Sequence, residues 1–324
     1  MRLFINIFVV SLILFSCKER ADKRVYKPDS SGNINSLLVV VDDDLWATSV
    51  GDAIRSRIGA EVYGLPQIEP QFDLRQVPPP VFSDFVRMNR IVLKVQRSVE
   101  STVKFYTDPY ATPQKMILVS GPSPQTIVEL IKKNGSRILN EFKKVELKER
   151  QRRTKKSLFN TDAIESSLGV SIALSSVYRI AKNEENFFWV RRDTKTGIIS
   201  LLIYSLPLQD FTSKEAFSQR VIQIRDSVAK QHIPGPIEGN YMTTEIAYTP
   251  FSVLTKTENI KVLETRSLWK VEGAFMSGPF INYSFLDKKN NRMLIAEGFV
   301  YAPSEPKRDY IFELESIIKS IKIQ

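Results

Sequence analysis

Asp42, Asp43 and Asp44 are three consecutive carboxylates that follow residues 37–41, an apolar run typical of a buried strand. Hard cations such as Ca²⁺ and Mg²⁺ bind several oxygen atoms at once, so this run is a candidate metal site. It lacks the spacing of an EF-hand loop, however. In the alternative interpretation Asp44 caps a helix that carries Trp46, and its two neighbours favour the positive end of that helix. The sequence leaves both interpretations open.

Cys17 is the only cysteine, and it stands where a targeting segment should end. Residues 1–16 contain Arg2 and then an apolar run that is shorter than the roughly 20 residues needed to cross a bilayer. Residues 14–17 (LFSC) resemble the bacterial lipobox. We therefore expect residues 1–16 to be a signal peptide and Cys17 to be lipidated, since two or three acyl chains make a lasting membrane anchor.

Residues 17–35 are polar and unpatterned, and they predict a flexible tether. Lys18 follows the cysteine in place of the aspartate that retains many lipoproteins in the inner membrane, so this likeness favours the outer membrane. The periplasmic and surface faces of that membrane both remain open. Export makes a nucleic-acid partner unexpected, although the formal net charge is +10.

His232 is the only histidine, which excludes a histidine-rich metal site and leaves one side chain for Ser-His or Cys-His catalysis. The proline-rich residues that follow it favour a loop or helix-end role. No glycine-rich phosphate loop is present, and we expect no cofactor.

Two further segments are candidates for binding. Residues 233–245 contain prolines and glycines that fix a loop presenting Tyr241 and Met242, with rigid packing of that loop against the core as the alternative. Arg150, Arg152 and Arg153 lie in a basic stretch. This stretch is either a contact for acidic lipid or another polyanion, or the solvated end of a helix.

The apolar patterns predict an α+β protein with two domains, residues 36–156 and 157–324, each an antiparallel sheet with helices packed on it. Ser123 and Pro124 open a helix in the first domain, because serine caps a helix and proline suits its first turn. In the second domain Trp269, Val271 and Phe275 share the buried face of a strand. The other expected elements are strands at 91–95, 116–119, 187–190, 198–204, 280–286 and 293–301, and a helix over 311–321.

Several short motifs resemble an uncharacterised family of Bacteroidetes lipoproteins that is known as a domain of unknown function. They are residues 40–43 with Trp46, 65–67, 69–72, 233–236, 239–242, 268–271 and 298–303. The resemblance implies an envelope location and no assigned activity. The strands and helix at the C-terminal end are also similar in outline to PsbP-like exported modules.

These observations favour a membrane-anchored envelope lipoprotein that binds or assembles with an envelope protein or glycan and has no catalytic role. The alternative is a carboxylate- or metal-dependent envelope enzyme that uses Asp42 and Asp43.

Overall fold

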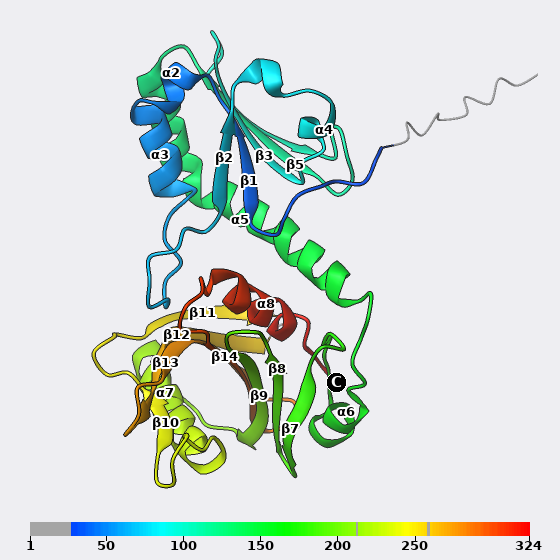
Figure 1. Ribbon diagram of the computed structural model, residues 1–324, viewed down its shortest axis with the longest axis vertical. Coiled ribbons are helices and arrows are strands. Elements are labelled where there is room, and N and C mark those ends of the chain that lie inside the picture. Colours follow the sequence, from blue (N-terminus) through cyan, green and yellow to red (C-terminus); the bar gives the residue numbers. More distant parts are fainter. Residues whose placement is uncertain (1–26, 212, 258–259) are drawn as a thin grey trace, which may run out of the picture.

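The computed structural model describes residues 27–211, 213–257 and 260–324. It contains two domains of helices and sheets, one above the other in Figure 1, and a long helix that extends from the first to the second. This confirms the expected α+β class with two domains.

The first domain is built on a five-stranded sheet in the order β2-β1-β3-β5-β4. Its strands are β1 (Ser36–Val40), β2 (Asp73–Val77), β3 (Ile91–Arg97), β4 (Thr102–Thr107) and β5 (Lys115–Gly121). Its helices are α2 (Asp43–Trp46), α3 (Ser49–Arg57), η1 (Pro79–Val81), α4 (Asp84–Arg87) and α5 (Pro124–Thr154).

The direction of these strands corrects the expected antiparallel sheet. The strands β2, β1, β3 and β5 are parallel to one another, and only β4 is antiparallel to its neighbour. Packing on both faces accounts for this arrangement. Leu37 and Val39 belong to the core that contains residues of α3 and α5, whereas Leu38 and Val40 pack with Phe82 on the other side. A strand covered on both faces carries a continuous apolar run, which is the usual signature of parallel sheets.

The helix α5 begins as expected, with the Ser123 side chain accepting a hydrogen bond from the Thr126 amide at 3.2 Å. Its 31 residues give a length of about 46 Å, at roughly 1.5 Å per residue. The basic stretch is therefore the last turns of this helix. Among the described residues no helix is both long and apolar enough to cross a membrane.

The second domain is built on an eight-stranded curled sheet in the order β10-β12-β13-β14-β9-β8-β7, with β11 also paired to β12. Its long strands are β7 (Arg179–Glu184), β8 (Phe187–Asp193), β9 (Ile198–Pro207), β11 (Phe251–Thr257), β12 (Ile260–Glu272), β13 (Ser277–Asp287) and β14 (Arg292–Tyr301). The short strands are β6 (Val170–Ser171), β10 (Tyr241–Thr244) and β15 (Lys322–Ile323), and the helices are α6 (Asp162–Leu168), α7 (Lys214–His232) and α8 (Arg308–Ile318).

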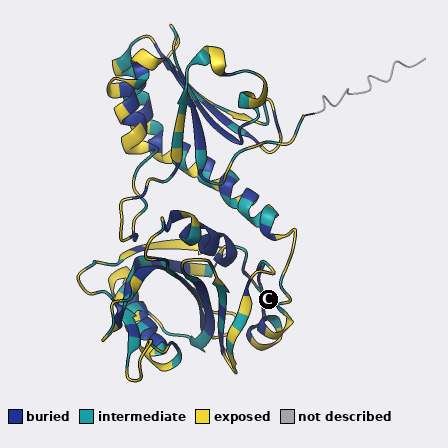
Figure 2. Cartoon of the chain, viewed as in Figure 1, coloured by how far each residue is buried: buried dark blue, intermediate teal, exposed yellow. Residues whose placement is uncertain are grey.

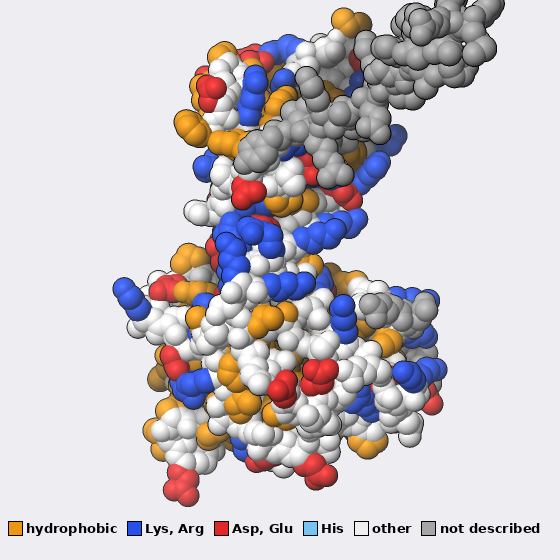
Figure 3. Space-filling model, turned by 90° about the vertical axis from the view of Figure 1, so that its right-hand side faces the viewer, with side chains coloured by type: hydrophobic (Ala, Val, Ile, Leu, Met, Phe, Trp, Pro, Cys, Tyr) orange, Lys and Arg blue, Asp and Glu red, His pale blue; other side chains and the backbone are white. Residues whose placement is uncertain are grey.

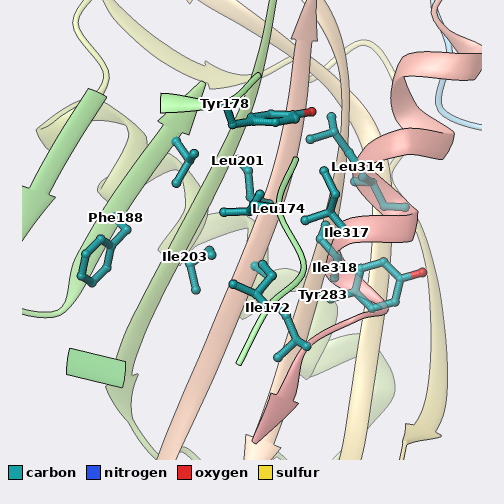
Figure 4. Close-up of a cluster of buried hydrophobic side chains, with 14 of the residues drawn as sticks. Ile172, Leu174, Tyr178, Phe188, Leu201, Ile203, Tyr283, Leu314, Ile317 and Ile318 are labelled. Atoms are coloured by element: carbon teal, nitrogen blue, oxygen red, sulfur yellow. The ribbon is translucent and has the colours of Figure 1, made fainter. Parts of the chain in front are cut away.

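Side chains on the two faces of this sheet form two separate cores. Leu201 and Ile203 of β9 pack with Leu314 and Ile317 of α8, and Leu174 of a preceding segment joins the same cluster (Figure 4). The alternate residues of β9 belong to the other core, which contains the apolar side of α7. The central strands are consequently buried on both faces, as the dark ribbon in Figure 2 shows.

A loop between α3 and β2, residues 60–72, extends from the first domain and packs against the second. We call it the arm. Leu65 at its tip is 6% exposed and belongs to the core beneath α8. Tyr63 donates a hydrogen bond to the Thr249 carbonyl at 2.9 Å. The carboxylate of Glu69 accepts hydrogen bonds from the amides of Lys307 and Arg308, at 2.7 and 2.8 Å, where α8 begins. The first domain therefore provides the cap for a helix of the second.

We predict that Glu69→Ala lowers the free energy of unfolding of the protein. Glu69 is 8% exposed, so the substitution leaves two enclosed amides without an acceptor and removes a negative charge from the positive end of α8. An orphaned buried donor costs about 1–3 kcal/mol, and the expected loss in unfolding free energy is about 2 kcal/mol or more by urea denaturation. Glu61→Ala, in an exposed residue of the same arm, should change that free energy by less than about 0.5 kcal/mol. Equal effects of the two substitutions would contradict this role of Glu69.

Candidate apolar binding pocket

A pocket of about 210 Å³ lies beside the C-terminal end of α7. The loop between α7 and β10 forms one wall, and side chains from β8, β9, β10, β12, β14 and the turn before β13 form the rest. Its lining residues are Trp189, Arg191, Ile198, Ser200, Ile233, Pro234, Gly235, Pro236, Met242, Trp269, Val271, Met276, Phe299 and Tyr301. We call this the tryptophan pocket. Its elements α7 and β10 lie on the side of the second domain that is away from the first domain (Figure 1).

The loop that forms the wall is fixed by close backbone packing. A Cβ atom on Gly235 would lie 2.4 Å from the Cβ of Asn240 and 2.9 Å from a methyl group of Val271, so only glycine fits there. The amide of Gly235 also donates to the carbonyl of Asn240 at 3.1 Å. The loop is therefore held in one place over the end of the sheet.

A buried polar network fastens α7 to the sheet beside the pocket. Arg225 of α7 is 1% exposed, and its Nε lies 3.0 Å from the carboxylate of Glu297 on β14. The guanidinium lies 4.1 Å from the ring centroid of Phe280 and donates to Thr244 of β10. Burial raises the pKa of Glu297, against the opposing effect of the Arg225 charge. Because α7 and β10 are both held by this network, the loop between them has fixed ends.

Two tryptophan side chains, Trp189 and Trp269, line the pocket. Trp189 donates its indole N–H to Ser200 at 3.1 Å. Trp269 is 2% exposed, and its indole N–H has no hydrogen-bond partner among the described residues. An enclosed donor without an acceptor is unfavourable by about 1–3 kcal/mol. The indole nitrogen is enclosed next to Gly278, since a Cβ atom on Gly278 would lie 3.1 Å from it.

Two exposed apolar residues adjoin lining residues in the sequence, since Phe275 precedes Met276 and Ile237 follows Pro236. Phe275 is completely exposed, and Ile237 is 67% exposed. The two residues lie in neighbouring loops, since a Cβ atom on Gly273 would lie 2.3 Å from the side-chain Nδ2 of Asn240. The sequence prediction placed Phe275 on the buried face of a strand, and this is wrong. The strand β12 ends at Glu272, and Gly273 then turns the chain with a φ of +84°.

The size of the pocket limits what it can hold. A cavity of roughly 150 Å³ accepts a benzene ring, whereas drug-sized ligands occupy roughly 300–1,000 Å³. At about 210 Å³ the tryptophan pocket fits one aromatic ring or one large aliphatic side chain. It is suited to the side chain of a partner protein or to a single-ring molecule.

The structure brings only one of the binding residues predicted from the sequence into this pocket. Met242 is 1% exposed and lines it. Tyr241, the adjacent residue, is half-buried outside it, where its ring centroid lies 4.3 Å from the Lys230 ammonium. The glycines and prolines at residues 233–239 were the signal for the loop. No pattern in the sequence indicated that residues of β8, β9 and β14 meet this loop.

The carboxylates of Asp43 and Asp44 have different partners. Asp43 accepts a hydrogen bond from Gln76 at 2.8 Å, and Asp44 pairs with Arg97. That hydrogen-bonded pairing lowers the pKa of Asp44. Asp42 precedes α2 without a side-chain cap bond. Within the described residues, no three His, Cys, Asp or Glu side chains are grouped as ligands for a metal ion.

Each of the three arginines is paired with a buried carboxylate. Arg150 pairs with Glu313 of α8, so it joins the two domains. Arg152 and Arg153 both donate to Glu149 at 2.7 Å. Burial alone would raise the pKa of Glu149, but these two hydrogen bonds and the nearby charges lower it to about 2. Arg152 remains 56% exposed, whereas Arg150 is largely covered.

His232 is the last residue of α7, which agrees with the helix-end role favoured by the sequence. Its ring stacks on Phe187 at 4.0 Å, and its Nδ1 lies 3.1 Å from both Lys182 and Glu184. Burial, with a smaller effect of the Lys182 charge, lowers its pKa. No serine or cysteine is among these contacts. Cys17 lies outside the described residues.

Two family models match the chain. Residues 30–155 match a domain of unknown function, DUF8532, and residues 157–320 match a second domain of unknown function, DUF4837. No curated protein matches the chain. The second match includes the curled sheet, the tryptophan pocket and α8, and it spans more than half of the sequence. The chain therefore belongs to the DUF4837 family.

Proposed function

We propose that this protein is a lipid-anchored binding protein of the bacterial envelope, without a catalytic role, that holds an apolar side chain of a partner protein in the tryptophan pocket. The observation that carries the proposal is an apolar pocket lined by two tryptophans, beside which Phe275 is completely exposed and Ile237 is 67% exposed. Buried anchor side chains in such pockets dominate many protein interfaces.

The sequence before residue 27 supports the envelope location. It contains the lipobox-like residues 14–17, a single cysteine and a polar segment after it. The likeness to Bacteroidetes lipoproteins and the Lys18 that follows Cys17 support the outer membrane. We expect an alkyne fatty acid fed to cells to label the wild-type protein, and Cys17→Ser to abolish both the label and sedimentation with membranes. Unchanged labelling of Cys17→Ser would contradict the anchor.

The binding role is tested in intact cells with a photo-crosslinking amino acid in place of Phe275. We expect one reproducible crosslinked protein in the envelope fraction. A matched control places the same amino acid at Val99, which is 98% exposed but lies in the first domain, and it should give no such product. Filling the pocket with Ser200→Leu should remove the product. A crosslink that survives this substitution, or that forms equally from Val99, would contradict the role of the pocket.

A further inference from the structure

The last turns of α5 expose a row of positive charges. Lys144, Lys148 and Arg152 are four residues apart, so they share one face of the helix, and Lys155 follows where the helix ends. All four are exposed. In the view of Figure 3, Lys and Arg side chains gather at the waist between the two domains.

A hollow of about 380 Å³ lies between this row and the turn that joins β4 to β5. Lys115, Lys144, Lys148 and Arg152 line it, together with three acidic residues that already have partners. Glu141 pairs with Lys115 and Lys144, Glu149 pairs with Arg152 and Arg153, and Asp108 accepts a hydrogen bond from the Gln114 amide. Lys148 forms no ion pair in the described part of the chain. The lining therefore keeps a small net positive charge.

The described chain begins at the edge of the same hollow. The ammonium of Lys27 donates a hydrogen bond to the carbonyl of Asp108. The amides of Ser30 and Ser31 then donate to the carbonyls of Thr112 and Met88, at 3.1 and 2.8 Å, which fixes this segment along the first domain. Residues 1–26, with Cys17 among them, precede Lys27, ten residues beyond that cysteine in the sequence.

We propose that this basic face contacts the phosphate groups of anionic phospholipids in the membrane that carries the anchor. The exposed lysines of this face are complementary to a phosphate group. A chain of ten residues extends at most about 35 Å, so the lipid proposed on Cys17 would keep this face close to the bilayer. Such a contact would orient the body on the membrane. This goes beyond the proposed function, and its test does not depend on lipidation.

The expected size of the effect follows from the number of charges. Each lysine near an anionic bilayer contributes about a fivefold increase in affinity, and the attraction falls off within a Debye length of about 10 Å at 0.1 M salt. Replacing Lys144, Lys148 and Lys155 by glutamine should therefore weaken binding by about 100-fold.

The test uses residues 17–324 with Cys17→Ser, so that neither an acyl chain nor the apolar residues 1–16 contribute. Binding is measured by sedimentation with vesicles of phosphatidylcholine alone or mixed with phosphatidylglycerol. We expect binding to the mixed vesicles only, loss of that binding at 0.5 M salt, and the 100-fold weakening in the triple variant. The control variant is Lys132→Gln, Lys133→Gln and Lys289→Gln, which removes the same charge from exposed lysines elsewhere and should bind as the parent does.

Three results would overturn the proposal. They are equal binding to both kinds of vesicle, equal weakening by the two triple variants, and no binding to mixed vesicles at low salt. If inorganic phosphate shifts the NMR signals of Lys148 while mixed vesicles do not bind, the hollow holds a soluble anion and the membrane contact is wrong. Because the protein carries no acyl anchor in any of these experiments, their outcomes do not bear on whether Cys17 is lipidated in cells.

Discussion

Replacing Arg225 with methionine should lower the unfolding free energy of the second domain by about 3–5 kcal/mol, the usual cost of removing one partner from a buried ion pair. Arg225 and Glu297 are 1% and 0% exposed, and they lie between α7 and the centre of the curled sheet. Without the guanidinium, the carboxylate of Glu297 would keep only the hydrogen bond from Asn282 at 2.9 Å. Urea denaturation followed by circular dichroism measures the change.

The loss should depend on pH. Burial already raises the pKa of Glu297 above its ordinary value of 4.5, and removing the positive charge raises it further. A carboxyl with a raised pKa contributes full stability below its unfolded pKa and loses it as the pH rises through the folded pKa. The defect of Arg225→Met should therefore be smaller at pH 4.5 than at pH 7. Adding Glu297→Gln should restore at least half of the stability at pH 7. A defect that does not change with pH would contradict this account.

Arg90→Ala should have a comparable effect on the first domain. Arg90 is 2% exposed and donates to both oxygens of Glu146 on α5, at 2.7 and 3.1 Å. It also donates to the carbonyls of Gly32 and Asn33, and Glu146 accepts the amide of Asn35 at 2.6 Å. The substitution leaves an enclosed carboxylate and releases the segment at residues 32–35, so we expect a loss of about 3–5 kcal/mol.

Hydrogen exchange and denaturation together test this role. The amides of residues 31–36 should exchange faster in Arg90→Ala than in the parent protein. Arg97→Ala is the control, because Arg97 and Asp44 form an exposed pair whose side chains are 46% and 61% exposed. Such a pair is worth about 0–1 kcal/mol. If the two substitutions cost the same, the buried network would not hold this segment.

The sequence predicted the elements that depend on local signals. Ser123 caps α5 as expected, and the strands expected around Trp269 and at residues 280–286 and 293–301 are present as β12, β13 and β14. The parallel strands of the first domain were missed, although the continuous apolar run at residues 37–41 is their usual signature. The domain boundary near residue 156 stays a prediction, as does the lipidation of Cys17.

The candidate pocket could not be predicted, because it depends on contacts between distant residues. Trp189, Trp269 and Tyr301 come from three strands, and nothing in their spacing shows that they line one space. Phe275 was assigned to the core because it continued an alternating pattern, which the turn at Gly273 interrupts. Asp42, Asp43 and Asp44 are adjacent in sequence, yet the side chains of Asp43 and Asp44 have different partners.

The indole N–H signals of the three tryptophans in NMR spectra test most directly whether the tryptophan pocket can hold an apolar side chain such as an aromatic ring. The ligand is p-cresol, which offers one ring and one oxygen acceptor. We predict that the signals of Trp269 and Trp189 shift and saturate as p-cresol is added. Trp46, in the first domain, should not move. If all three signals stay fixed up to millimolar p-cresol, or shift together, the pocket is not the binding site that the account requires.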